Sequence, residues 1–328
     1  MAEYKGIKGF KVQYLSADPS DPIIGQTWYN STSKDLKYTS LSTTGSWATG
    51  NNMNTARFEV AGAGTQTAGL AFGGSPSPTG ATEEYDGTSW VSNPTGLNTA
   101  RTYLAGAGIQ TAALGFGGAI PSPGGTGATE EYNGATWTSV NSMNTARFYL
   151  AGAGIQTAAL AFGGQNPSGN LGATEEYDGN SWTTSPSSLA TARELLSGAG
   201  TQTAGLAFMG TPAPTGITEE YNGTTWATSP GSINTTRAQG AGAGIQTAAL
   251  AFGGANPPVT NLGATEEYDG TSWTTSPGSL NTARRALGGF GTQTAGLAFG
   301  GTLGPANSAA TEEWNSPSGP ATKTITVS

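Results

Sequence analysis

Large and small apolar residues alternate along the chain in short segments that predict β-strands. In residues 158–162, Leu160 and Phe162 lie on one face of an extended strand and alanines lie on the other. Alanine and leucine also favour helices by intrinsic propensity, so a helix is the competing interpretation. Glycines precede this segment, and Gly163–Gly164 follows it. Since each glycine would cost a helix about 1 kcal/mol, the strand is the better prediction.

The neighbouring residues complete a unit of four strands. The stretch at 148–154 precedes the apolar strand, and a loop rich in Pro and Gly leads to a short strand at 174–177. Asp178–Gly179 then gives a strong signal for a tight hairpin turn. A last strand follows around Trp182. The sequence of this unit therefore predicts two hairpins joined by a loop.

The whole unit recurs six times. A Thr-Ala-Arg or Thr-Thr-Arg segment places its arginine at Arg57, Arg101, Arg147, Arg193, Arg237 and Arg284. A Glu-Glu pair recurs at Glu83–Glu84, Glu130–Glu131, Glu175–Glu176, Glu219–Glu220, Glu266–Glu267 and Glu312–Glu313. The interval of 44 to 47 residues between arginines fits a four-stranded propeller blade, and it also overlaps the helical HEAT and armadillo repeats. The strand pattern favours the blade.

The order of features within each unit resembles the kelch motif: an apolar strand, Gly-Gly, a loop, an acidic strand ending in Tyr, a tight turn and a Trp strand. The markers in the first unit are Gly73–Gly74, Tyr85 and Trp90, and the resemblance covers residues 44–315. It implies an all-β fold, a six-bladed kelch-like β-propeller with blades starting near 55, 99, 145, 191, 235 and 282. Kelch propellers serve many functions, so the resemblance implies little about activity.

The two ends of the repeat region predict how the ring closes. The sixth unit has Trp314 in the Tyr position and lacks a Trp strand of its own, while such a strand occurs upstream around Trp47. We therefore expect this N-terminal strand to complete the sixth blade. Closure would leave only short, protected sheet edges.

This closure predicts three parts of the chain. They are an N-terminal attachment segment with a small β element (1–45), the propeller (46–315) and a C-terminal tail (316–328). The tail alternates like a strand at 322–327. Two places are open for it: an added outer strand on the sixth blade, or the place otherwise taken by the Trp47 strand.

Composition and charge exclude several kinds of chemistry and partner. The chain has no Cys and no His, which excludes disulfides, thiolate nucleophiles and the usual zinc ligands, and we expect no cofactor or metal. Residues 1–52 hold five Lys and four acids, and the rest holds seven Arg, one Lys and 17 acids. Without a basic stripe, we expect neither nucleic acid nor an anionic membrane surface as a partner. No segment has the apolar length of a membrane span or a signal peptide, so the sequence predicts a soluble chain without membrane insertion.

The repeated Arg and Glu-Glu residues invite a catalytic interpretation, a pair of carboxylates beside an arginine. Neighbouring residues of a strand point to opposite faces, so the two Glu side chains of a pair cannot converge on one substrate. Features present in all six copies also serve the fold first. We expect one Glu of each pair to meet an Arg or a backbone donor between blades.

Two short stretches differ between copies while the rest scarcely changes. One is the triplet after each repeated arginine, and the other is the loop after Gly-Gly. In a propeller the triplet would begin the innermost strand and the loop would return to the same end, so we expect both around one mouth of the central channel. Two interpretations are open, a binding surface or drift of surface loops, which vary anyway. The candidate ligand-binding residues are Phe58, Glu59, Tyr103, Phe148, Tyr149, Glu194, Gln239 and Arg285, and none is assigned as catalytic.

The N-terminal segment carries a second resemblance. Residues 25–38 run Gly-Gln-Thr-Trp-Tyr-Asn and end in Leu-Lys-Tyr, which predicts two strands around a polar turn. The segment resembles part of bacteriophage virion proteins, especially tail, fibre and head-appendage proteins, and the low-charge repeats are similar to those of marine phages. The resemblance implies localisation in the virion, with this segment attached to other virion proteins and the propeller displayed outward. The other interpretation is a hairpin that packs on the ring.

Together these features predict a non-enzymatic structural protein of a phage virion, such as a tail fibre used in host attachment. Its propeller would bind a host-surface glycan or a neighbouring virion subunit, with aromatic side chains stacked on sugar rings. One alternative is an intracellular kelch-type adaptor that binds a partner protein. Another is a propeller glycosidase or lyase, for which Glu59 and Glu194 are the only non-repeated acids near the mouth.

Overall fold

The computed structural model describes residues 12–20, 26–41, 45–121, 124–212, 216–256, 260–316 and 320–324 of the 328-residue chain. These residues form strands, turns and irregular segments and contain no helix. Within them, accordingly, no helix is long and apolar enough to cross a membrane. The chain divides into two compact units, one of residues 46–315 and one of residues 1–45 together with 316–328.

The larger unit contains six four-stranded antiparallel sheets. The first strands of the sheets are β5 (Ala61–Thr65), β9 (Ala105–Ile109), β13 (Ala151–Ile155), β19 (Ser197–Thr201), β23 (Ala241–Ile245) and β29 (Gly288–Gly291). The second strands are β6 (Ala68–Phe72), β10 (Ala112–Phe116), β14 (Ala158–Phe162), β20 (Ala204–Phe208), β24 (Ala248–Phe252) and β30 (Ala295–Phe299). The third strands are β7 (Thr82–Tyr85), β11 (Thr129–Tyr132), β17 (Thr174–Tyr177), β21 (Thr218–Tyr221), β27 (Thr265–Tyr268) and β31 (Thr311–Asn315). The fourth strands are β8 (Trp90–Asn93), β12 (Trp137–Val140), β18 (Trp182–Thr184), β22 (Trp226–Thr228), β28 (Trp273–Ser276) and β4 (Ser46–Gly50).

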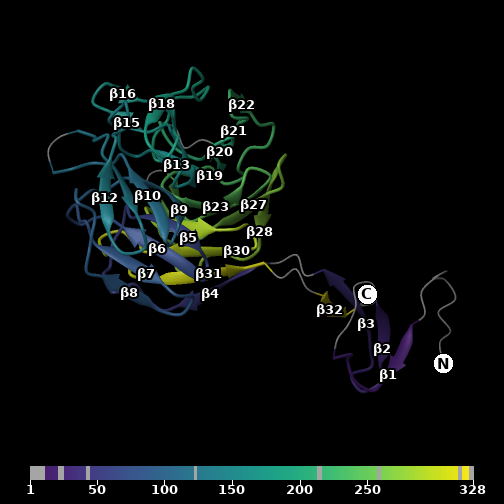
Figure 1. Ribbon diagram of the computed structural model, residues 1–328. Helices are drawn as coiled ribbons and strands as arrows, with labels where there is room; N and C mark the ends of the chain where they lie inside the picture. Colours follow the sequence, from purple (N-terminus) through teal and green to yellow (C-terminus); the bar gives the residue numbers. More distant parts are fainter. Residues whose placement is uncertain are drawn as a thin grey trace. The chain divides into compact units, whose positions relative to one another are not determined.

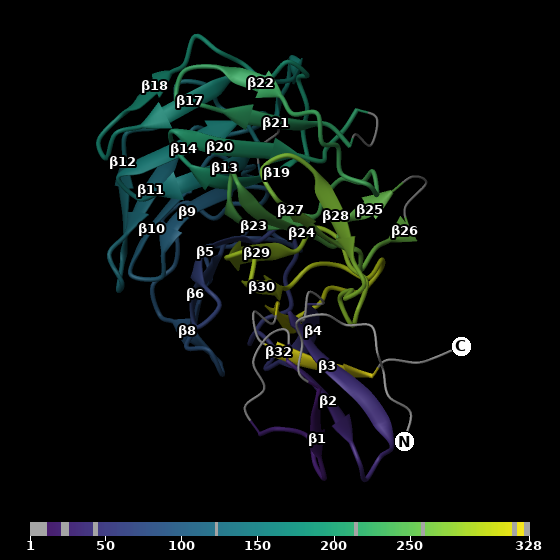
Figure 2. The same ribbon diagram turned by 90° about the vertical axis from the view of Figure 1, so that its right-hand side faces the viewer.

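The six sheets follow one another in a propeller-like arrangement. Figure 1 shows first strands such as β5, β9 and β13 near the middle of the larger unit and fourth strands such as β8, β12 and β28 near its periphery. Each first strand contacts the first strand of the next sheet, and β29 contacts β5. Two further hairpins, β15 (Gln165–Asn166) with β16 (Gly169–Asn170) and β25 (Ala255–Asn256) with β26 (Thr260–Asn261), lie in the loops after Gly-Gly. Figure 2 shows β25 and β26 at one side of the unit.

Each sheet packs a face of large side chains against a face of small ones on its neighbour. Leu114 and Phe116 of β10 share a buried cluster with Ala159 and Ala161 of β14. The Phe116 ring also lies 5.0 Å from the ring of Trp182, measured between centroids. A fully buried Leu or Phe contributes about 1.5–3 kcal/mol to stability. The alternation in the sequence therefore reflects burial of both faces of every sheet.

Glycine is required where the first strands of adjacent sheets approach each other. A Cβ atom at Gly106 of β9 would lie 2.6 Å from the carbonyl oxygen of Gly62 in β5 and 2.8 Å from the ring of Phe72. Any side chain at this position would push the two sheets apart. The repeated Gly-Ala-Gly segments therefore allow the close packing of neighbouring sheets.

Two sets of side-chain hydrogen bonds join each sheet to the one before it. The indole N–H of the Trp in each fourth strand donates to a Thr hydroxyl in the preceding sheet. The pairs are Trp90–Thr311, Trp137–Thr82, Trp182–Thr129, Trp226–Thr174, Trp273–Thr218 and Trp47–Thr265, at 2.8–3.0 Å. The Gln in each first hairpin donates to two carbonyl oxygens of the preceding sheet, as Gln110 does to Gly69 and Tyr85 at 3.0 and 2.8 Å. Every junction between sheets is therefore held by the same pair of donors.

The smaller unit contains one sheet with the strand order β1-β2-β3-β32. β1 (Gln13–Leu15) runs parallel to β2 (Thr27–Asn30), which forms an antiparallel hairpin with β3 (Asp35–Leu41). The two strands predicted within residues 25–38 are confirmed. β32 (Pro320–Thr324) pairs with β3, so both placements considered for the tail are wrong. The place of the Trp47 strand is taken, because β4 occupies the outer edge of β31, and the tail forms the edge strand beside β3 and not beside β4.

The Asp18 carboxylate accepts three side-chain hydrogen bonds in the smaller unit. Asp18 accepts hydrogen bonds from Lys37 Nζ at 2.8 Å, Asn30 Nδ2 at 2.7 Å and Trp28 Nε1 at 3.0 Å. These bonds, that of Lys37 foremost, lower the pKa of Asp18 to about 2. The carboxylate therefore stays charged at neutral pH and ties the segment after β1 to the hairpin.

Candidate binding site

The middle residues of the six variable triplets are joined in a ring by backbone hydrogen bonds. The N–H of each donates to the C=O of the middle residue in the preceding triplet. The bonds run from Tyr103 to Glu59 (3.3 Å), Tyr149 to Tyr103 (3.2 Å), Leu195 to Tyr149 (3.0 Å), Gln239 to Leu195 (3.0 Å), Ala286 to Gln239 (2.8 Å) and Glu59 to Ala286 (2.7 Å). All six residues have φ between 53° and 59°, a left-handed conformation that costs a non-glycine residue about 1–3 kcal/mol. Such strain persists only where the surroundings hold it, and the ring of bonds does so.

The prediction that each triplet begins an inner strand is wrong, because the left-handed residue interrupts the extended backbone. The strand starts directly after the triplet, as β5 does at Ala61. The first residue of each triplet instead forms an isolated β-bridge with the loop after Gly-Gly. These bridges are Phe58↔Ser75, Thr102↔Ala119, Phe148↔Gln165, Glu194↔Thr211, Ala238↔Ala255 and Arg285↔Thr302. The two variable stretches therefore lie side by side in every unit.

A cavity of about 120 Å³ lies at this ring. It is lined by all six middle residues and by the third residues of the triplets, which are Val60, Leu104, Leu150, Leu196, Gly240 and Leu287. Four of the candidate residues line it: Glu59, Tyr103, Tyr149 and Gln239. Leu195 and Ala286 line it as well. Both are middle residues of their triplets, and this position in the sequence could have identified them as candidate site residues.

The other four candidates are first residues of their triplets: Phe58, Phe148, Glu194 and Arg285. They are not part of the cavity lining and lie beside the variable loops. The Phe148 ring packs against Tyr149 with centroids 4.7 Å apart. The guanidinium of Arg285 donates to Asn261 Oδ1 at 2.8 Å. The structure thus divides the candidates between the cavity and the surface around it.

Glu59 is the centre of a polar network on one side of the cavity. Its Oε2 accepts hydrogen bonds from Ser75 Oγ at 2.7 Å and Thr102 Oγ1 at 2.6 Å. Burial, together with a hydrogen bond to Glu59, raises the pKa of Tyr103. The Tyr103 and Tyr149 rings meet edge to face with centroids 4.0 Å apart. This side of the cavity therefore combines a carboxylate with a pair of aromatic rings.

Glu194 is a second unusual carboxylate near the ring. Thr211 Oγ1 donates to its Oε1 at 3.4 Å, while its Oε2 is buried without a hydrogen-bond partner among the described residues. Burial raises the pKa of Glu194. Within the part of the chain that the structure describes, neither Glu194 nor Glu59 forms an ion pair.

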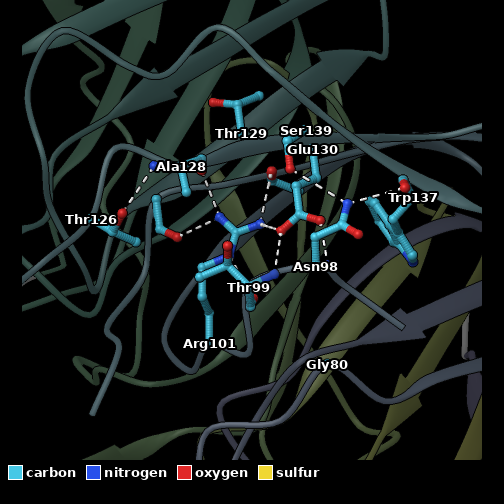
Figure 3. Close-up of polar contacts among 12 residues, drawn as sticks. Gly80, Asn98, Thr99, Arg101, Thr126, Ala128, Thr129, Glu130, Trp137 and Ser139 are labelled. Atoms are coloured by element: carbon cyan, nitrogen blue, oxygen red, sulfur yellow. Dashed lines mark hydrogen bonds and ion pairs between the residues drawn. The ribbon is translucent and has the colours of Figure 1, made fainter. Parts of the chain in front are cut away.

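The repeated Arg and the first Glu of each pair form buried ion pairs that belong to the fold. Figure 3 shows Arg101 beside Glu130, to which it donates at 2.9 Å, and Arg101 also donates to the carbonyl oxygen of Ala128. Glu130 accepts a further bond from the N–H of Asn98 at 2.6 Å. The other pairs are Arg57–Glu83, Arg147–Glu175, Arg193–Glu219, Arg237–Glu266 and Arg284–Glu312. The expected Arg or backbone partner is confirmed, but the contact ties a connecting segment to the sheet that follows it rather than two sheets to each other.

The second Glu of each pair lies on the opposite face, and in five of the six pairs it meets a neighbouring sheet. It accepts a hydrogen bond from a Tyr hydroxyl in five pairs: Tyr132–Glu84, Tyr177–Glu131, Tyr221–Glu176, Tyr268–Glu220 and Tyr85–Glu313. Glu267 is different, because Trp314 occupies the Tyr position of the next sheet and donates to the carbonyl oxygen of Gln293. Burial raises the pKa of Glu267, and a hydrogen bond with Ser276 opposes this shift. The Glu-Glu residues thus act in two separate structural networks.

A second cavity, of about 140 Å³, is lined by the Gly-Ala-Gly segments of the first strands, with Phe290 in place of Ala in β29. Its lining consists of backbone and small apolar groups and includes no charged side chain. Across the described ranges, no three acidic side chains gather into a group that could hold a metal ion. Of the two cavities, the one at the triplet ring is therefore the one lined by charged, polar and aromatic side chains.

Neither protein-family models nor curated proteins assign a role to this site. No protein-family model matches the chain. No curated protein matches it either. The role of the site is therefore inferred from the arrangement of its residues.

Proposed function

We propose that the six sheets are the blades of a closed, six-bladed kelch-like β-propeller with β4 as the closing strand. The support comes from three sets of contacts that each return from the last sheet to the first: the Trp–Thr bonds, the Gln–carbonyl bonds and the backbone ring of the triplets. At that junction Trp90 donates to Thr311 at 2.8 Å, and Gln66 donates to the carbonyl oxygen of Trp314 at 2.7 Å. β4 also pairs with β31 along its whole length.

We expect Trp90→Phe and Trp137→Phe to lower the free energy of unfolding by equal amounts, about 2 kcal/mol each. Each change removes one indole–threonine hydrogen bond and leaves a small cavity. Of these two tryptophans, Trp90 spans the junction between the last and first sheets and Trp137 does not, so Trp137 is the matched control. Denaturant unfolding of both variants measures the difference. An open junction would make Trp90→Phe measurably milder than Trp137→Phe.

We further propose that the protein is a non-enzymatic binding protein whose ligand site is the mouth surrounded by the triplets. The observation that carries this proposal is that the variable residues of six repeats come together at one cavity while the rest of each repeat is nearly constant. Each repeat contributes its own side chains to such a site, so the lining can differ from repeat to repeat while the fold stays the same.

The proposed ligand is a host-surface glycan or a neighbouring subunit of a phage virion. Tyr103, Tyr149 and Phe148 present aromatic rings of the kind that stack on sugars and that are enriched in protein interfaces. In this proposal the N-terminal segment attaches the protein to other virion proteins. The support is that both chain ends join in a compact unit with its own sheet. The proposed location is therefore the virion, with tail or fibre proteins as the setting.

We expect the double change of Tyr103→Ala and Tyr149→Ala to weaken adsorption of virions to host cells by about tenfold or more, since buried aromatic residues dominate interface energies. Adsorption of virions that carry the variant measures the effect. Ile155→Ala is the control, because Ile155 is exposed at the end of β13 and is not part of the cavity lining. An unchanged unfolding midpoint shows that the variant is folded. Adsorption equal to that of the unaltered virion would reject this site.

A further inference from the structure

The size of the cavity at the triplet ring limits what can enter it. Its volume is about 120 Å³. Pockets that enclose whole small molecules are larger, about 300–1,000 Å³. The cavity therefore fits one group that projects from a larger ligand, and a complete sugar ring could contact only its rim.

The charge of the cavity favours a cation. Glu59 lines it, and the hydroxyls of Ser75 and Thr102 hold its carboxylate in place through Oε2. The first Glu of each repeated pair has its own arginine, whereas Glu59, like the second Glu of each pair, has no ion-pair partner among the described residues. The 46–315 unit as a whole has seven Arg and no Lys against 17 acids. A carboxylate held at a cavity without a counter-charge is a favourable position for a positive group.

The remaining lining favours an alkyl chain behind that positive group. Leu195, Leu196 and Ala286 contribute apolar surface to the cavity. Tyr103 and Tyr149 contribute aromatic rings, which attract cations at their faces. The lining side chains that carry hydrogen-bonding groups are those of Glu59, Gln239, Tyr103 and Tyr149.

We infer that the cavity binds the protonated primary amine at the end of an alkyl chain, as in a lysine side chain of a partner protein. The ammonium group contacts the Glu59 carboxylate and the tyrosine rings, and the alkyl chain lies against Leu195 and Ala286. The Glu194 carboxylate, whose buried Oε2 lacks a hydrogen-bond partner within the described residues, interacts electrostatically with Tyr149 of the lining. This inference rests on the proposed binding function and selects a neighbouring protein subunit over a neutral glycan as the ligand.

The test is a titration of the full chain with n-butylammonium and with 1-butanol, its neutral counterpart, followed by NMR or calorimetry. We expect n-butylammonium to bind with a Kd of roughly millimolar order, as suits five heavy atoms, and 1-butanol to bind at least tenfold more weakly. Glu59→Gln keeps an acceptor for the two hydroxyls and removes the charge, and we expect it to weaken n-butylammonium binding by about tenfold or more. Equal binding of the two compounds, or no effect of Glu59→Gln, would overturn the inference.

The matched control is Asp178→Asn, which removes one negative charge from a turn outside the cavity. Asn133 and Asn222 occupy the equivalent turns of other repeats, so this change is compatible with the fold. We expect n-butylammonium binding within twofold of the unaltered chain. An equal loss in both variants would mean that overall charge and not Glu59 attracts the amine, which also overturns the inference. Adsorption that depends on the Tyr103 and Tyr149 pair, without any amine binding, would reject this ligand and leave the proposed function standing.

Discussion

Replacing Arg284 with Met lowers the free energy of unfolding by about 3–5 kcal/mol, whereas the same change at Arg285 lowers it by less than about 1 kcal/mol. Both side chains of the Arg284–Glu312 pair are almost fully buried. Met fills much of the space of the arginine, so the main loss is the positive charge beside a carboxylate that stays buried. Arg285 is partly exposed, and among the described residues its guanidinium donates a hydrogen bond to Asn261, a neutral group, so its loss leaves no buried charge there.

Denaturant unfolding of the two variants measures this contrast between neighbouring residues of the same type. The double variant Arg284→Met with Glu312→Gln should recover part of the loss, because the remaining group is then neutral. The equivalent change Arg101→Met should match Arg284→Met, since Arg101 forms the same pair with Glu130. Similar costs for Arg284→Met and Arg285→Met would show that the repeated ion pair does not stabilise the sheets.

The strands could be predicted from the sequence because each is determined by its immediate neighbours. The hairpin at Asp178–Gly179 illustrates this: the Asp178 carboxylate accepts bonds from the N–H groups of Asn180 and Ser181 at 2.9 and 2.7 Å. All the atoms that fix this turn lie within four residues of sequence. The alternation before Gly163–Gly164 is equally local, so it identified β14 without any knowledge of the rest of the chain.

Features that depend on distant residues could not be predicted in the same way. The pattern of the tail indicates a strand but not its partner, and β32 pairs with β3 near the other end of the chain. The parallel pairing of β1 with β2 is likewise set by a connection outside either strand. Glu59 has a left-handed backbone because its N–H bonds to Ala286 of the sixth repeat, a contact that no local pattern encodes.

The candidate site was predictable in part for the same reason. Comparison of six internal copies shows which positions vary, and the middle triplet residues are among them. It does not show that only the middle and third residues of each triplet reach the cavity. That division follows from the left-handed turn, which separates Glu59 from Phe58 and Tyr149 from Phe148.

The fourth repeat carries an exchange of large and small residues that predicts a strong coupling. In the other repeats a glycine with left-handed backbone lies under an apolar side chain of the next repeat, as Gly163 lies under Leu196. In the fourth repeat the glycine is replaced by Met209, at φ 63°, and the covering residue is Gly240. A Cβ atom at Gly240 would lie 2.6 Å from the sulfur of Met209. The fully buried Met209 side chain therefore fills the space that a leucine fills elsewhere.

We expect Gly240→Leu alone to lower the free energy of unfolding by about 1–3 kcal/mol through overpacking against Met209. Met209→Gly alone should lower it by about 2–4 kcal/mol, because the cavity outweighs the relief of a left-handed non-glycine residue. The double variant restores the arrangement of the other repeats and should lie within about 1 kcal/mol of the unaltered protein. Denaturant unfolding of all four proteins gives the coupling energy between the two positions. If the two costs simply add in the double variant, the two side chains do not share one space, and the repeats differ in packing at this junction for another reason.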